Sequence, residues 1–125
     1  MKVIEEKIGD QIFDIYIGKN AKENWELIDN SDSFDLWFHV EDLPSGHVVI
    51  KERFSDKLNY PNYPNYPNYP NYPNQLISLA ASYCKSQSKY KNTTKLKIVY
   101  TEISNLKKGK EVGSVYIKNP QYIFV

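Results

Sequence analysis

The sequence predicts an α+β domain in which a curved antiparallel sheet has two helices packed on it. Two observations predict this class. Short runs of β-branched and aromatic residues recur along the chain, and two segments with helical spacing of apolar residues lie between them. The 125 residues suffice for one hydrophobic core, so we expect a single domain over residues 1–125.

The first two strands are expected at residues 2–7 and 11–17, joined by a tight turn at Gly9 and Asp10. Side chains alternate between the two faces of a strand. One face of the second strand therefore carries its apolar side chains and is expected to meet the core. These are Phe13, Ile15 and Ile17.

The first helix is expected to begin near Asn20, because Asn20 and Glu23 have the spacing of a capping box. A stripe of side chains then follows at helical spacing, with Asn24 beside it. The residues of this stripe are Ala21, Trp25 and Ile28.

Two further strands are expected at residues 34–41 and 47–54. The residues between them, Leu43-Pro44-Ser45-Gly46, favour a turn. We expect this pair to form the centre of the antiparallel sheet.

A perfect triplet repeat, "NYPNYPNYPNYPNYP", runs from Asn59 to Pro73. Proline at every third position can extend neither a helix nor a sheet ladder, so we expect an inserted loop over residues 59–74 that lies outside the core. Closing a loop costs only about 0.6 kcal/mol more for each doubling of its length, so the fold tolerates the insertion. The alternative is a docking arm for a partner.

The second helix is expected to follow the repeat, with Asn74 as its cap and an apolar face made of Leu76, Leu79, Ala80 and Tyr83. The chain then returns to strands at residues 95–101. A lysine-rich linker over residues 102–113 precedes two closing strands, "SVYIK" and "QYIFV".

The composition limits the function classes. The formal net charge is +1, so nucleic-acid binding would require a local patch. Cys84 is the only cysteine, which excludes an internal disulfide and a multi-cysteine zinc site. The sequence contains neither an apolar run of membrane-spanning length nor the apolar core of a signal peptide, so we expect an intracellular, cytoplasmic protein. The oligomeric state is left open.

Two histidines, His39 and His47, lie at adjacent ends of the predicted central strands. A metal site would need a third ligand from Asp35, Glu41, Asp42 or Cys84, and neither an HExxH motif nor a CxxC pair is present. We therefore expect both histidines to be structural, and we expect no catalytic residue, metal or cofactor. A small metal-dependent enzyme is the alternative.

Two groups of lysines are candidates for binding phosphate. Lys19 and Lys22 flank the predicted start of the first helix, where free N–H groups and the helix dipole favour an anion. The alternative is a well-capped helix with solvated lysines. The second group lies in the linker and would form one positive face with Lys95 and Lys97, near Trp37 or Tyr100 as stacking surfaces. Its members are Lys107, Lys108 and Lys110.

Three stretches together carry a resemblance to a known family: "IYIGKNAKEN", "DLWFHVEDLPSGHVVI" and "IVYTEISNLKKGKEVG". In this order and spacing they resemble the NFACT-R domain. This domain closes the large ribosome-quality-control proteins and also occurs alone, in the family of coiled-coil-domain-containing protein 25. The resemblance covers nearly the whole chain apart from the repeat. It is strongest to the stand-alone type, whose coiled-coil tail does not follow here.

The resemblance implies an RNA-binding module associated with tRNA, rRNA or the ribosome, without known catalysis. It implies that Trp37, His39 and His47 belong to the family's pattern, and we expect them to shape the sheet. This chain departs from the large relatives at Lys19, where they often have arginine, and at Ser45-Gly46, where they read Gly-Ser. The candidate nucleic-acid-binding residues are Lys19, Asn20, Lys22, Asn24, Lys107, Lys108 and Lys110.

The alternative function is a protein-interaction adaptor that uses the Tyr-Pro repeat as its docking surface.

Overall fold

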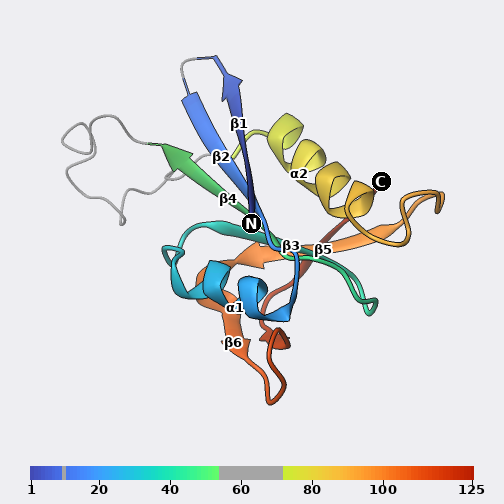
Figure 1. Ribbon diagram of the computed structural model, residues 1–125. Helices are drawn as coiled ribbons and strands as arrows, with labels where there is room; N and C mark the ends of the chain where they lie inside the picture. Colours follow the sequence, from blue (N-terminus) through green and yellow to red (C-terminus); the bar gives the residue numbers. More distant parts are fainter. Residues whose placement is uncertain (10, 54–71) are drawn as a thin grey trace.

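The computed structural model describes residues 1–9, 11–53 and 72–125 (Figure 1), so most of the triplet repeat lies outside the described residues. Within them the chain forms helices, strands and one 3₁₀ turn. In chain order these elements are β1 (Lys2–Ile8), β2 (Gln11–Ile17), α1 (Ala21–Asp29), β3 (Leu36–Val40), β4 (Val48–Arg53), α2 (Asn74–Ser86), β5 (Lys97–Glu102), η2 (Ile103–Asn105), β6 (Leu106–Lys108), β7 (Val115–Ile117) and β8 (Gln121–Phe124).

The main sheet has six strands in the order β1-β2-β4-β3-β5-β8, and each neighbouring pair is antiparallel. The predicted α+β class is confirmed, and β3 and β4 form the central pair as expected. The expectation for the lysine-rich linker was wrong. It contains η2 and β6, and β7 pairs with β6 in a separate two-stranded sheet instead of joining the main sheet.

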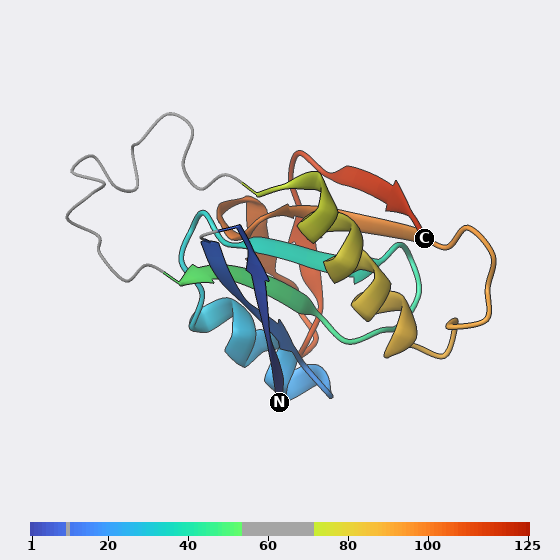
Figure 2. The ribbon, with the colours of Figure 1, turned by 90° about the horizontal axis from the view of Figure 1, so that it is seen from above.

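The sheet separates two layers (Figures 1 and 2). Helix α2 covers one face, and α1 and the β6–β7 hairpin cover the other. Neighbouring residues of β3 show this division. Phe38 packs in the cluster on the α2 side, and Trp37 packs with Leu27 of α1 on the opposite side.

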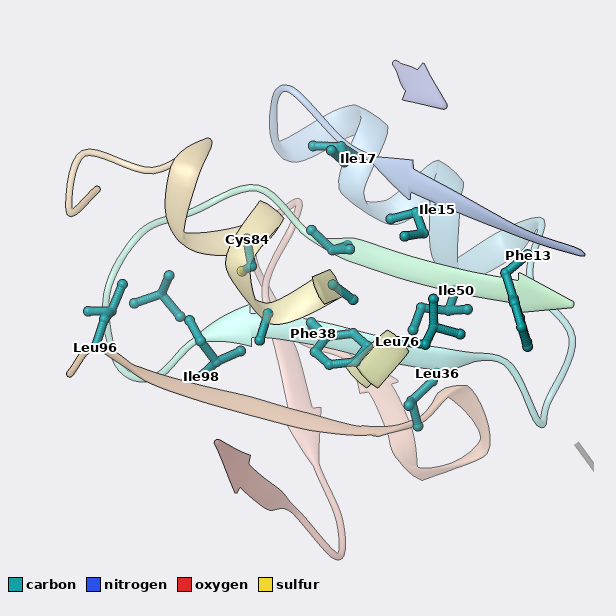
Figure 3. Packing of buried hydrophobic residues seen from close by; sticks show 14 residues of the cluster. Phe13, Ile15, Ile17, Leu36, Phe38, Ile50, Leu76, Cys84, Leu96 and Ile98 are labelled. Atoms are coloured by element: carbon teal, nitrogen blue, oxygen red, sulfur yellow. The ribbon is translucent and has the colours of Figure 1, made fainter. Parts of the chain in front are cut away.

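The larger core lies under α2 (Figure 3) and includes the predicted apolar face of β2. The prediction for α2 was partly right. Leu76 and Ala80 are buried, but Ala81 and Cys84 complete the buried face, and Leu79 and Tyr83 are only half-buried at its margin.

Pro73 caps α2, so the expectation that Asn74 is the cap was wrong. Asn74 is the first helical residue. The Pro73 ring fixes an extended residue before the helix, with φ −60° and ψ 145°, and its carbonyl accepts hydrogen bonds from the N–H groups of Leu76 and Ile77.

The last copy of the repeat packs against the domain. The Tyr72 ring lies 6.2 Å from the Phe13 ring, and its hydroxyl donates a hydrogen bond of 3.1 Å to the carbonyl of Phe34. The expectation that the repeat lies outside the core was therefore wrong at this end. Residues 59–71 are outside the described residues.

Helix α1 begins as predicted. Asn20 is its N-cap, and the Asn20 side chain accepts the N–H of Glu23 at 2.9 Å. The predicted stripe was only partly right. Ile28 packs against the core on this face of the sheet, but the buried residues are Asn24 and Leu27, and Ala21 is exposed. The spacing of apolar residues was misleading because the buried face of α1 includes a polar residue, Asn24, whose side chain accepts a hydrogen bond from the backbone of His47.

Candidate nucleic-acid interface

A cleft opens where four segments meet: the β2–α1 junction, the β3–β4 loop, the chain after α2 and the tip of the β6–β7 hairpin. Its volume is about 430 Å³, within the size range of sites for small ligands. We call this site the cleft. Residues that line it include Lys19, Asn20, Asn24, His39, His47 and Lys89.

Asn24 connects two walls of the cleft. Its side-chain oxygen accepts the backbone N–H of His47 at 3.0 Å, and the N–H of Gly18 donates to the carbonyl of His47 at 3.0 Å. Asn24 is buried, with 6% of its surface exposed. The structure therefore gives this predicted RNA contact a framework role, since its oxygen positions the β3–β4 loop against α1.

Two glycines permit this close approach. A Cβ atom on Gly46 would lie 2.3 Å from the carbonyl oxygen of Gly18, and a Cβ atom on Gly18 would lie 2.2 Å from the side-chain oxygen of Asn24. Both distances are too short for real contacts, so the β3–β4 loop reaches α1 only because neither residue has a side chain.

Gly46→Ala is expected to lower the free energy of unfolding by about 1–3 kcal/mol, because the added methyl group pushes the loop away from Gly18. Urea unfolding at neutral pH measures this loss. Gly9→Asn is the control, since Gly9 has a positive φ of 61° that asparagine tolerates and nothing lies near its Cβ position. Equal stability of Gly46→Ala and wild type would contradict the described packing.

The two histidines meet as predicted, with their rings 5.2 Å apart and nearly perpendicular. His47 is 2% exposed, and its Nδ1 has no hydrogen-bond partner among the described residues. Burial, with a smaller contribution from the neighbouring His39, lowers the pKa of His47 to about 3. Burial also lowers the pKa of His39. Neither ring therefore supplies positive charge at neutral pH.

Trp37 is fully buried, so the expectation that it offers a stacking surface to bases was wrong. Its ring stacks parallel to that of His39 with centroids 5.7 Å apart and meets the edge of His47 at 5.2 Å. The interpretation that these residues shape the sheet fits this cluster. Tyr100, the other suggested surface, is half-buried and stacks on Phe38.

The start of α1 is partly neutralised by its own side chains. The backbone N–H of Lys19 donates to Glu23 Oε1 at 3.1 Å, and the N-terminal ammonium lies 3.1 Å from the same oxygen. The hydrogen bond from Lys19 lowers the pKa of the Glu23 carboxyl group, followed by that from the ammonium. The Glu23 carboxylate therefore opposes an anion at this helix start, and the exposed side chains of Lys19 and Lys22 attract one.

The second lysine group does not reach the cleft. Lys108 Nζ lies 2.6 Å from Asp29 and 5.0 Å from the Trp25 ring, so its charge is already paired. Lys107 is exposed on β6 opposite Tyr116, and Lys110 is exposed in the hairpin turn. Of the predicted residues, the structure brings Lys19, Asn20 and Asn24 together at the cleft. Lys22 is exposed on the first turn of α1. The other three, Lys107, Lys108 and Lys110, lie on the hairpin.

Sequence reasoning missed Lys89 and Gly113, which line the cleft from distant segments. Lys89 follows α2 by three residues, and no local pattern distinguishes it from other solvated lysines. Gly113 had a weaker signal, as a glycine in a basic segment. It has a positive φ of 89° and packs against Ala21.

In the described part of the chain, no three His, Cys, Asp or Glu side chains lie close enough together to hold a metal ion. Burial raises the pKa of the Cys84 thiol to about 12, so this thiol is not a nucleophile at neutral pH. None of the described helices combines the length and the apolar character needed to cross a membrane.

Comparison with protein families gives a match over residues 6–119 to the model described as "NFACT protein RNA binding domain". Among curated proteins, the coiled-coil domain-containing protein 25 homolog of Dictyostelium discoideum is 32% identical over 120 residues, covering 94% of this chain and 53% of that protein. The Rqc2 homolog RqcH of Bacillus subtilis is 29% identical over 114 residues, covering 89% of this chain and 17% of that protein.

Among solved structures, the C-terminal part of the fibronectin/fibrinogen-binding protein from Streptococcus suis superposes with a TM-score of 0.74 at 24% identity. The match covers 100% of this chain and 45% of the other, and it establishes a shared fold. The chain spans about half the length of the Dictyostelium relative and less than a fifth of RqcH.

Proposed function

Because the chain belongs to the NFACT protein RNA binding domain family, we propose that it is a non-catalytic RNA-binding module that acts on tRNA or rRNA at the ribosome. The observation that carries the proposal is the family match over residues 6–119, which includes every residue lining the cleft. Similarity to RqcH supports a role in ribosome quality control. A cytoplasmic location follows from that role and is part of the proposal.

Within the module, the cleft is the proposed phosphate site. Lys19, between β2 and α1, and Lys89, after α2, both line it, and both are exposed. Asn20 lines the same wall as Lys19, and Lys22 lies one turn of α1 further on. Lysine side chains attract the RNA backbone through charge and without reading sequence. Lys107 and Lys110 on the hairpin extend the proposed contact to a second stretch of backbone.

The salt dependence of tRNA binding tests this site. We expect Lys19→Gln/Lys89→Gln to weaken binding and to reduce the slope of log affinity against log salt by about 2, one for each lost phosphate contact. Fluorescence anisotropy across a salt series measures both quantities. Lys7→Gln/Lys118→Gln is the matched control. Lys7 is exposed on β1 at the end that pairs with Ile12, far from the β2–α1 junction, and Lys118 is exposed after β7, at the end of the hairpin away from Gly113.

Two outcomes would contradict the proposal. If wild type shows no salt-dependent affinity for tRNA or rRNA fragments, the RNA-binding function fails. If the control pair lowers the slope as much as the cleft pair, the binding reflects overall charge instead of a site.

A variant whose repeat is shortened to its last copy, residues 71–73, tests the adaptor alternative. Retained RNA binding after this deletion separates the repeat from the RNA function.

A further inference from the structure

The outer edge of the main sheet exposes two aromatic rings. Tyr122 and Phe124 lie two residues apart on β8, so they face the same side, and they are 44% and 60% exposed. Ile123, between them, points the other way and packs with the core under α2. Both rings therefore lie on the face that also carries α1, the hairpin and the cleft.

A lysine accompanies these rings. Lys97 on β5 pairs in register with Phe124, and its ammonium nitrogen lies 4.2 Å from the centre of the Tyr122 ring. Lys97 is exposed. We call Lys97, Tyr122 and Phe124 the aromatic edge. It combines two exposed rings with a cation that lies over one of them.

The aromatic edge and the cleft are related by the strand register. His39 of β3 pairs with Val99 of β5, which pairs with Tyr122 of β8, so the three residues form one row across the sheet. Neighbouring strands are about 4.8 Å apart, which places the Tyr122 backbone about 10 Å from that of His39. One RNA strand is long enough to contact both sites.

Exposed rings beside a lysine have the chemistry of a site for unpaired bases. Every base has a π-face that stacks on an aromatic ring, and a nearby cation attracts the adjacent phosphate. Bases inside a duplex are already stacked and cannot be reached in this way. The charge and the rings thus favour a single strand over a duplex.

We propose that the aromatic edge stacks unpaired bases of RNA, so that this module prefers single-stranded segments to duplexes. This inference rests on the proposed RNA-binding function and names the form of RNA that it takes. Tyr122 and Phe124 provide the stacking surfaces, and Lys97 orients the Tyr122 ring and attracts phosphate.

The test compares a fluorescently labelled twelve-nucleotide oligouridine with a duplex RNA hairpin of similar length, by anisotropy at fixed salt. Tyr122→Leu/Phe124→Leu keeps apolar side chains and removes both rings. We expect it to bind the single strand about tenfold or more weakly, with less than a twofold change for the duplex. Tyr122→Phe is the matched control, since it keeps both rings of the aromatic edge and is expected to change the affinity for either RNA by less than about twofold. Circular dichroism checks that each variant is folded.

The failures of the two proposals are distinguishable. If wild type binds neither RNA, the proposed function itself fails. If wild type binds RNA but the double variant weakens both ligands equally or neither, the aromatic edge is not a stacking site, while the RNA-binding function stands. If the double variant instead abolishes a dimer seen by analytical ultracentrifugation and leaves RNA binding unchanged, the exposed β8 edge serves self-association, which overturns the inference.

Discussion

Lys51→Met is expected to lower the free energy of unfolding by about 3–5 kcal/mol, because it leaves a buried carboxylate without its cation. Lys51 Nζ lies 2.7 Å from Asp35 Oδ2, and the backbone N–H of Asp32 donates to the same oxygen at 2.7 Å. The side chain of Asp35 is only 2% exposed. Because so little of the Asp35 side chain reaches solvent, water compensates only a small part of the lost interaction.

Urea unfolding at pH 7 measures the loss, and Lys51→Met/Asp35→Asn is the control. The double variant removes the carboxylate charge and is expected to recover part of the stability. Burial raises the pKa of Asp35, and Lys51 opposes this increase. Without Lys51 the folded-state pKa of Asp35 rises further above the unfolded value, so the stability difference between the single variant and wild type should shrink as the pH falls from 7 towards 4. A loss below about 1 kcal/mol at pH 7 would mean that the pair is effectively solvated.

His47 is expected to make the protein sensitive to acid. Its pKa is lowered to about 3 in the folded state, against an unfolded value near 6.5. Between these values the unfolded chain binds a proton that the folded chain does not, so stability is complete above pH 6.5 and falls as the pH decreases towards 3. This residue alone should cost about 2–3 kcal/mol between pH 7.5 and pH 4.5.

Urea unfolding at pH 7.5 and pH 4.5, on wild type and His47→Phe, isolates this contribution. Phenylalanine keeps a ring against Trp37 and removes the titrating group. We expect the free energy of unfolding to fall between pH 7.5 and pH 4.5 by about 2–3 kcal/mol less in the variant than in wild type. The pKa of His39 is lowered in the same direction, so some sensitivity remains in both proteins. An identical loss in the two proteins would show that His47 is not responsible.

The sheet was largely predictable from local sequence pattern. Turn residues bound its central strands, and the side chains along each strand alternate between the two faces of the sheet. Strand β6 was not predictable, since "LKK" has no apolar alternation. It becomes a strand only by pairing with Val115–Ile117, and that pairing depends on the hairpin packing of Leu106 and Val115 beside α1. Tertiary contacts of this kind leave no trace in a short window of sequence.

The candidate site was predictable only in part. The Asn20 cap and the meeting of the histidines follow from spacing and strand order. The burial of Trp37 did not follow, because it depends on α1 crossing the same face of the sheet. Lys89 lies seventy residues after Lys19 in the sequence, and the two line the same cleft only because of where α2 is placed. Side chains that meet through tertiary packing cannot be grouped by a pattern along the chain.

The anchoring of Tyr72 and Pro73 bears on how the gene can change. Each copy of the repeat is the same triplet, so gain or loss of whole copies always places another Asn-Tyr-Pro directly before Asn74. The tyrosine that binds the Phe34 carbonyl and the proline that caps α2 are therefore regenerated at every copy number. Copy-number polymorphism in this tract is thus buffered at its downstream boundary, and alleles of different length should differ little in how they start the second helix.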